Sequence, residues 1–246
     1  MLINATQDGL KTLKLHGMLK ALESQLRVPD TSGLSFEERL GNMVDMELSV
    51  RSNNKIQSRL KKSKLSHTPS IEDFDGKGIE RAVVVSLATS EWARRKLNIL
   101  IDGKTGVGKT YLAYALAQKA CRDGYTVKCD RASRLFNELS IAKADGRYAK
   151  MLSDLSKIQI LVIDDFGLFS LSEEQRHDLL EILEDRYLLH STIITSQVPS
   201  EHWYDLIGDP TIADAILDRL VHNSHKIHLS GESRRREMAK ELQPVN

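Results

Sequence analysis

The sequence has few of the features that mark secreted or membrane proteins. Cysteine occurs only twice, at Cys121 and Cys129, and this spacing is not that of a metal site. We therefore expect no zinc, and we expect the reducing cytoplasm as the compartment. The first residues lack the basic region and apolar run of a signal peptide. The longest apolar run, at residues 82–88, is too short to cross a bilayer, so no membrane association is predicted.

An excess of charge of one sign is also missing. Among 246 residues, 35 lysines and arginines stand against 34 acids, which gives a formal net charge of +1. Overall charge therefore predicts no nucleic-acid partner, and only a local basic patch could indicate one. The content of 41% hydrophobic and 28% charged residues is typical of a globular protein. The length suits one large domain, or a large domain with a small one.

What the sequence does contain is the pattern Gly-x-x-x-x-Gly-Lys-Thr at residues 103–110. A leucine- and isoleucine-rich segment precedes it and an alanine- and leucine-rich segment follows, which is the strand, loop and helix context of a P-loop. Glycines let successive N–H groups turn toward phosphate oxygens, and the helix start adds its positive dipole end. An ordinary glycine turn is the alternative. The pattern predicts that ATP contacts Gly103, Lys104, Thr105, Gly106, Val107, Gly108, Lys109, Thr110 and Tyr111.

Strand and helix patterns alternate through the rest of this region. The strands are expected at residues 97–101, 125–129, 158–163, 191–195 and 225–229. Helices are expected between them, among them one at 133–142 and one from Ser172 to about Leu189. This alternation predicts an α/β fold with a five-stranded parallel sheet that helices cover on both faces. In such a sheet the ligand binds beyond the carboxyl ends of the strands.

Two carboxylates follow the third expected strand, at Asp164 and Asp165. Acids are common where strands lead into loops, but beside a P-loop they suggest phosphoryl-transfer chemistry. Thr110 and Asp164 are then predicted to hold Mg²⁺, and Lys109 to contact the β- and γ-phosphates. Asp165 is predicted to orient or deprotonate the attacking water.

Further along, polar and basic residues have more open roles. The fourth strand ends in Thr195, Ser196 and Gln197, where a polar side chain could bond the attacking water or the γ-phosphate, or could belong to an ordinary turn. Arg219 could be an arginine finger or an ordinary arginine on a helix surface. The arginines at 234–236 could contact phosphate or form a solvated tail.

The first 66 residues have helical patterns, with a capping box at Ser35 and Glu38 that starts a long helix. Residues 67–78 are expected to form a linker, and residues 79–246 the main domain. The long helix carries basic residues at steps of four, four and three, which place them on one face. Such a stripe suits the phosphate backbone of duplex DNA, and a solvated face without a partner is the alternative. The stripe consists of Arg51, Lys55, Arg59 and Lys62.

In this order, the motifs resemble those of the IstB/DnaC-like AAA+ ATPases, and most closely the IstB transposition helper proteins of insertion sequences. The resemblance covers nearly the whole chain and is carried by residues 34–40, 46–48, 51, 72–75, 103–110, 161–167, 195–197, 217–220 and 231–233, with Arg235. It implies an ATPase that binds ATP and Mg²⁺ between the subunits of a homo-oligomer, assembles on duplex DNA, and recruits or stimulates the transposase of the same insertion element.

The resemblance also implies individual roles. Lys109 and Thr110 correspond to Walker A, Asp164 and Asp165 to Walker B, Gln197 or Ser196 to sensor 1, Arg219 to an arginine finger that acts on the neighbouring subunit, and Arg235 to sensor 2. Asp165 departs from the pattern, because many AAA+ proteins have glutamate there. The chain after Leu229 would form about 25 Å of helix at most, too little for a full helical lid.

Three other functions stay open. A replicative helicase loader of the DnaC type would differ only in its protein partner. A protein that binds ATP as a scaffold without hydrolysis would need the same loop. A small-molecule P-loop kinase is less favoured, because kinases usually close an arginine-bearing lid of their own, whereas this sequence has paired acids and Arg219.

Overall fold

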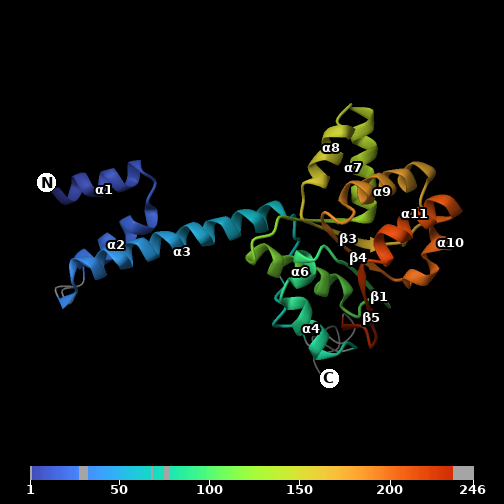
Figure 1. Cartoon of the computed structure of the whole chain (residues 1–246), viewed down its shortest axis with the longest axis horizontal. Coiled ribbons are helices and arrows are strands. Elements are labelled where there is room, and N and C mark those ends of the chain that lie inside the picture. The colour runs from blue at the N-terminus through green and yellow to red at the C-terminus, as the bar shows by residue number, and fades with distance from the viewer. Residues whose placement is uncertain (1, 28–32, 68, 75–77, 235–246) are drawn as a thin grey trace, which may run out of the picture. The chain divides into compact units, whose positions relative to one another are not determined.

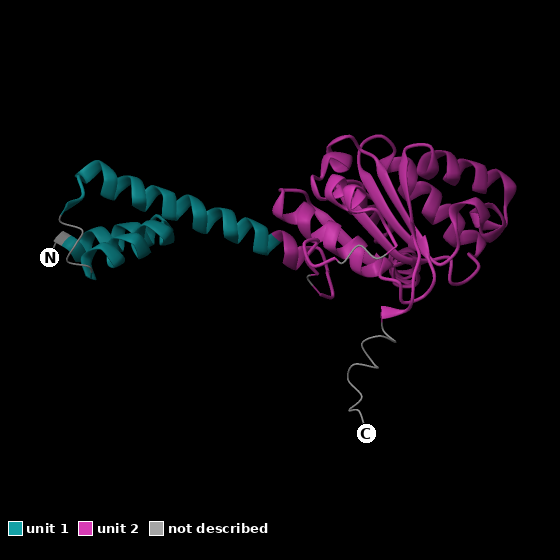
Figure 2. Cartoon of the chain, turned by 90° about the horizontal axis from the view of Figure 1, so that it is seen from below, with its two compact units in different colours: residues 1–58 teal, residues 59–246 magenta. Residues whose placement is uncertain are grey.

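The structure is a computed structural model that describes residues 2–27, 33–67, 69–74 and 78–234. The chain forms two compact units, Met1–Ser58 and Arg59–Asn246, which Figure 2 shows in separate colours. The described part of the first unit is all helical, whereas the second unit contains a β-sheet. This combination agrees with the predicted fold class.

The described residues of the first unit form three helices, of which the third continues into the second unit. They are α1 (Leu2–Thr12), α2 (His16–Arg27) and α3 (Phe36–Lys62). The predicted capping box starts α3. The N–H of Glu38 donates to Ser35 Oγ at 3.2 Å, and the N–H of Ser35 donates to Glu38 Oε2 at 2.7 Å.

A buried carboxylate joins α2 to α3. The N–H groups of Gly17 and Met18 donate to Glu47 Oε2 at 2.6 and 3.2 Å, which satisfies donors that the start of α2 leaves free. The helices lie so close that a Cβ on Gly17 would be 2.5 Å from Glu47 Cα, so only glycine fits there. Glu47 Oε1 also pairs with Arg51 Nε at 2.7 Å.

The last turn of α3 and the residues after it belong to the second unit. Leu60 packs against the core of that unit, and Ser63 is fully buried. The Ser63 carbonyl accepts the N–H of Cys129 at 2.8 Å, and Lys64 Nζ pairs with buried Asp130 at 3.6 Å. Because of these contacts, the division into compact units falls within α3, whereas the sequence places the end of the helical module at residue 66.

The second unit is built on a five-stranded sheet in the order β2-β3-β4-β1-β5, and all neighbouring strands are parallel. The strands are β1 (Asn98–Gly103), β2 (Val127–Arg131), β3 (Ile160–Phe166), β4 (Ser191–Ser196) and β5 (Ser224–Leu229). Each overlaps its predicted range. The predicted parallel sheet is confirmed by these pairings, and its three central strands β1, β3 and β4 are almost entirely buried on both faces.

Helices cover both faces of this sheet (Figure 1). Ile99 and Ile101 face a core shared with α4 (Arg81–Ala88), α5 (Glu91–Arg94) and α6 (Lys109–Arg122). Leu100 faces the opposite core, which includes residues of α7 (Ala132–Ala144), α8 (Tyr148–Ser156), α9 (Glu173–Arg186), α10 (Trp203–Ile207) and α11 (Pro210–Val221). A short 3₁₀ helix, η2 (Ser200–His202), precedes α10. None of the described helices is long and apolar enough to cross a membrane.

The helix α9 begins after Ser172, as predicted, and Ser172 forms a capping box with Gln175; the helix ends at Arg186, before the predicted end near Leu189. At this helix end the Arg186 guanidinium is buried and binds backbone carbonyls at the end of α8, in the segment that leads to β3 and at the first residue of β4. It donates at 2.8, 2.6 and 2.6 Å to the carbonyl oxygens of Leu155, Ile158 and Ser191.

Candidate nucleotide-binding site

The loop between β1 and α6 has the backbone shape that its glycines permit. Gly103, Gly106 and Gly108 have φ angles of 143°, 88° and 109°, in the left-handed region that other residues rarely adopt. Lys109 opens α6 and is buried. Its Nζ donates to the carbonyls of Gly103 and Lys104 at 2.8 and 2.9 Å. The loop therefore surrounds the ammonium group that the sequence assigns to phosphate.

Asp164 lies beside this loop, at the carboxyl end of β3. The hydroxyls of Thr110 and Thr195 both donate to Asp164 Oδ1, at 2.9 and 2.6 Å. The second oxygen, Oδ2, is buried and has no hydrogen-bond partner among the described residues. Burial raises the pKa of Asp164 above its ordinary value, and the charge of Asp165 raises it further. A carboxylate oxygen without a partner, next to a threonine hydroxyl, fits a hard divalent cation such as Mg²⁺.

Asp165 has a different environment from its neighbour. The regular pairing of β3 with β4 is interrupted between Ile163 and Phe166, and Asp165 has a φ of 58°, which aspartate tolerates better than most residues. Its carboxylate lies 3.8 Å from Arg131 Nε, and its side chain is 33% exposed. Asp164 is thus buried like a metal ligand, whereas Asp165 is open to water as a base must be.

Thr195 bonds with both of these acidic residues, a role that the sequence does not single out among residues 195–197. Besides its bond to Asp164, its Oγ1 accepts the N–H of Asp165 at 3.0 Å. Of the two residues predicted beside it, Ser196 uses its Oγ to accept the N–H of Val198 at 3.0 Å. Gln197 Oε1 accepts the hydroxyl of the P-loop Thr105 at 2.8 Å, so Gln197 is the one that contacts the loop.

Two residues from outside the P-loop region, Phe74 of the predicted linker and Arg234 near the end of the described chain, lie beside the loop. The N–H of Arg234 donates to the carbonyl of Gly106 at 3.0 Å, and its guanidinium carbon lies 4.9 Å from the centroid of the Phe74 ring. Phe74 stacks on Tyr111 with centroids 6.0 Å apart. Of the three arginines among which the sequence leaves the choice open, Arg234 thus contacts the loop. Arg235, the predicted sensor-2 residue, lies outside the described residues.

Arg219 lies near the amino end of β1, whereas the P-loop follows the carboxyl end of this strand. The Arg219 carbonyl accepts the side-chain amide of Asn98 at 3.1 Å, and Asn98 begins β1, whereas Gly103 ends it. At 3.3 Å per residue, the strand rises by about 16 Å between these positions. The Arg219 guanidinium pairs with the Glu184 carboxylate, and Nη1 donates to the carbonyl of Ala215 at 2.8 Å. Arg219 and the P-loop of the same chain are therefore not brought together.

The four residues of the predicted basic stripe all lie on α3. Lys55 and Lys62 are exposed, and Arg59 is half-buried. Arg51 is exposed but pairs with Glu47. The four cations are therefore not equivalent, because Arg51 has an acidic partner within its own helix.

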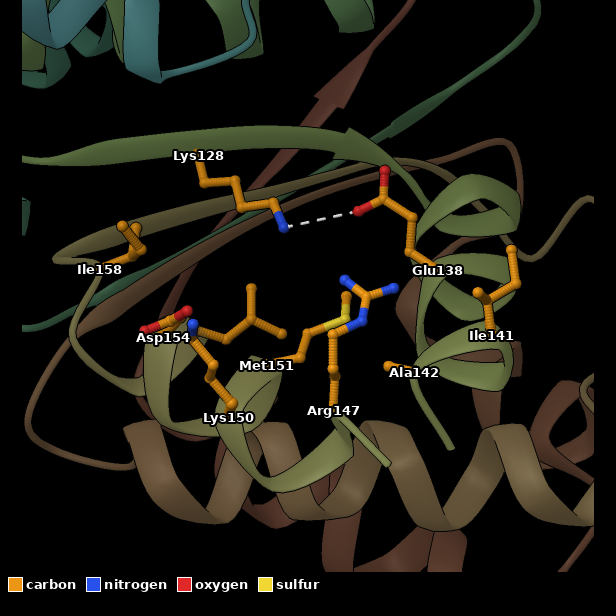
Figure 3. A pocket seen from close by; sticks show the side chains of 10 residues that line it. Lys128, Glu138, Ile141, Ala142, Arg147, Lys150, Met151, Asp154 and Ile158 are labelled. Carbon is orange, nitrogen blue, oxygen red and sulfur yellow. Dashed lines mark ion pairs between the residues drawn. The ribbon is translucent and has the colours of Figure 1, made fainter. Parts of the chain in front are cut away.

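A cavity of ≈ 530 Å³ opens between β2, α7 and α8 (Figure 3). Its lining combines apolar residues such as Met151 and Leu155 with charged ones, and Lys128 pairs with Glu138 across it at 3.8 Å. None of the predicted site residues is among those that line it. This cavity is thus separate from the predicted nucleotide chemistry.

The motifs of this site occur in a known family. The chain matches the family model described as IstB-like ATP binding protein over residues 8–241. The chain belongs to this family. A relative from Sinorhizobium fredii, named as an insertion sequence ATP-binding protein, is 48% identical over 239 residues, which cover 96% of this chain and 98% of the relative. The resemblance that the sequence motifs carry is therefore confirmed.

Solved structures agree with this family in fold. The DnaC helicase loader has a TM-score of 0.55 at 20% identity, with 65% of this chain and 96% of the loader covered. The replication initiator DnaA, solved with AMPPCP and single-stranded DNA, has a TM-score of 0.58 at 20% identity. That match covers 74% of this chain and 58% of the DnaA chain. These likenesses confirm the AAA+ fold.

Proposed function

We propose that this IstB-like protein is an ATPase that assembles on duplex DNA as a homo-oligomer and recruits or stimulates the transposase of its insertion element. The observation that carries the ATPase part is the cluster around the P-loop, where Lys109, Thr110, Asp164 and Asp165 lie together at the carboxyl ends of β1 and β3. The insertion-sequence context of the Sinorhizobium relative supports the transposition part.

Each residue of the cluster has a role in this proposal. Thr110 and Asp164 would hold Mg²⁺, since the partnerless Asp164 oxygen offers it a ligand. When bound, Mg²⁺ neutralises charge on the β- and γ-phosphates. Lys109 exchanges its two loop carbonyls for phosphate oxygens, which places its charge where negative charge develops. Asp165 accepts a proton from the attacking water, and Gln197 orients that water.

The position of Arg219 favours catalysis between subunits. An arginine finger must approach the γ-phosphate, yet Arg219 lies near the amino end of β1, away from the P-loop of its own chain. The Arg219 of one subunit therefore acts on ATP held by the next, so that assembly and hydrolysis are coupled. Loss of the finger is expected to slow turnover about a thousandfold, with ATP binding to the single subunit unchanged.

A mixing experiment tests this proposal. Arg219→Ala and Lys109→Ala are each expected to be inactive in ATP turnover. In a mixed oligomer, some interfaces place an intact Lys109 opposite an intact Arg219, so activity should return. If the two variants assemble together, as judged by light scattering, and activity stays absent, the shared site is refuted.

The DNA part of the proposal depends on the basic stripe of α3. Replacing Arg51, Lys55, Arg59 and Lys62 with alanine should weaken binding to all duplex sequences alike. The slope of log affinity against log salt should become shallower by about 0.9 for each phosphate that the variant no longer neutralises. The control variant replaces Lys14 and Lys20, two exposed cations outside the stripe, and should keep the slope. A stripe variant with an unchanged slope would move the DNA site elsewhere.

A DnaC-type helicase loader is the second candidate, supported by the fold shared with that loader. Both functions use the same ATP site and differ in the protein bound. A pull-down with the transposase of the same element and, separately, with a replicative helicase distinguishes them. A small-molecule kinase is not favoured, because Arg219 does not lie at the phosphate loop of its own chain.

A further inference from the structure

We propose that Glu184 is a positioning residue that holds the guanidinium of Arg219 in the orientation needed by the neighbouring subunit's ATP. The inference rests on the proposed function, in which Arg219 acts between subunits. Glu184 belongs to none of the sequence motifs, and it reaches Arg219 only through the packing of α9 against α11. The ion pair between Glu184 Oε2 and Arg219 Nε joins these two helices.

Buried residues next to Glu184 and Arg219 anchor α9 and α11. Glu184 lies between two buried residues of α9, Leu183 and Arg186, and Arg186 is bonded to three backbone carbonyls. On α11, Arg219 is followed by fully buried Leu220, and its carbonyl accepts the Asn98 amide. The backbone positions of Glu184 and Arg219 are therefore set by buried neighbours on each helix.

The pair restricts the Arg219 side chain without using up its donors. A guanidinium has five N–H donors. Nε is engaged by Glu184, and one donor of Nη1 by the carbonyl of Ala215. Three N–H groups remain at the outer end of a side chain that is still 24% exposed. Because Nε and Nη1 are both bonded, the Arg219 side chain has fewer rotamers to lose when it binds a phosphate.

The same ion pair adds little to the stability of the fold, because the Glu184 side chain is 58% exposed and water screens the pair there. The hydrogen bond from Arg219 holds the pKa of Glu184 below its ordinary value, which favours the charged form of the carboxylate. Removing the carboxylate should therefore leave the fold intact and release the finger. Misplacement of a catalytic group by about an ångström costs on the order of a hundredfold in rate.

The test compares ATP turnover by Glu184→Ala, Glu184→Gln and Asp185→Asn. Asp185 is the matched control, an exposed acid next to Glu184 on α9. Glu184→Ala should lower kcat by about ten- to a hundredfold with KM for ATP unchanged, and Glu184→Gln, which still accepts a hydrogen bond, should lower it less. Asp185→Asn should behave as wild type, and thermal unfolding should be the same for all.

Two further measurements separate positioning from other roles. The double variant Glu184→Ala with Arg219→Ala should turn over no more slowly than Arg219→Ala alone, because the two residues act as one unit. Mixing Glu184→Ala with Lys109→Ala should restore activity, since the second protein supplies an intact finger and its glutamate. Unchanged or faster turnover by Glu184→Ala, beside a slow Arg219→Ala, overturns only the role of Glu184. Normal turnover by Arg219→Ala overturns the shared site as well.

Discussion

Replacing Thr195 with valine tests how the two acids of β3 are held. Valine keeps the β-branched shape of this fully buried residue but removes the hydroxyl. That hydroxyl donates to Asp164 at 2.6 Å and accepts the N–H of Asp165 at 3.0 Å. A hydrogen bond to a charged group contributes about 1.5–3 kcal/mol, and a donor left unpaired costs about 1–3 kcal/mol. The N–H of Asp165 is only partly buried, so we expect a total loss of about 3 kcal/mol.

Urea and thermal unfolding, followed by tryptophan fluorescence, measure this loss in the second unit, because both tryptophans, Trp92 and Trp203, are buried there. The melting temperature should fall by about 6–12 °C, at 2–4 °C per kcal/mol for a unit of this size. Thr195→Ser keeps the hydroxyl and removes the methyl group instead, so it is the control for altering this buried side chain without losing its hydrogen bonds. If the valine and serine variants are equally stable, Thr195 does not hold the acids as described.

Two predictions concern those acids. Asp165→Asn, which also tolerates a positive φ, should bind ATP normally but hydrolyse it about a hundred- to ten-thousandfold more slowly; failure to bind ATP would instead make Asp165 a ligand or a structural residue. Because burial raises the pKa of Asp164 above 3.8, the stability that this carboxyl contributes to the metal-free protein is greatest at acid pH and is lost as the pH rises through the raised pKa. The unfolding free energy of the wild type relative to Asp164→Asn should therefore increase as the pH is lowered toward 4, and a flat difference would show that burial does not perturb this group.

The parts of the site that the sequence predicts are those built from neighbouring residues. The P-loop, the acids at 164–165, the capping box of Ser35 and the helix start at Ser172 each lie within a few positions, where spacing alone decides geometry. The parallel sheet follows for a similar reason, since runs of apolar residues separated by helices have few other arrangements.

The parts that the sequence misses depend on contacts between distant segments. Thr195 reaches the acids of β3 only because β4 lies beside β3, a strand order that the sequence does not state. Arg234 contacts Phe74, although most of the second unit's sequence separates the two residues. The acidic partner of Arg51, by contrast, can be predicted from the sequence, because Glu47 lies one helical turn before it.

The bond between the Ser63 carbonyl and Cys129 also protects the sheet. A parallel sheet has two edge strands whose unpaired backbone groups can join those of another chain and begin aggregation. At the β2 edge, Ser63 occupies the Cys129 N–H, and Lys64 adds a charge beside it. At the other edge, β5 presents exposed Lys226. Copies of this chain can thus be crowded together, as the proposed assembly requires, without their sheets fusing edge to edge.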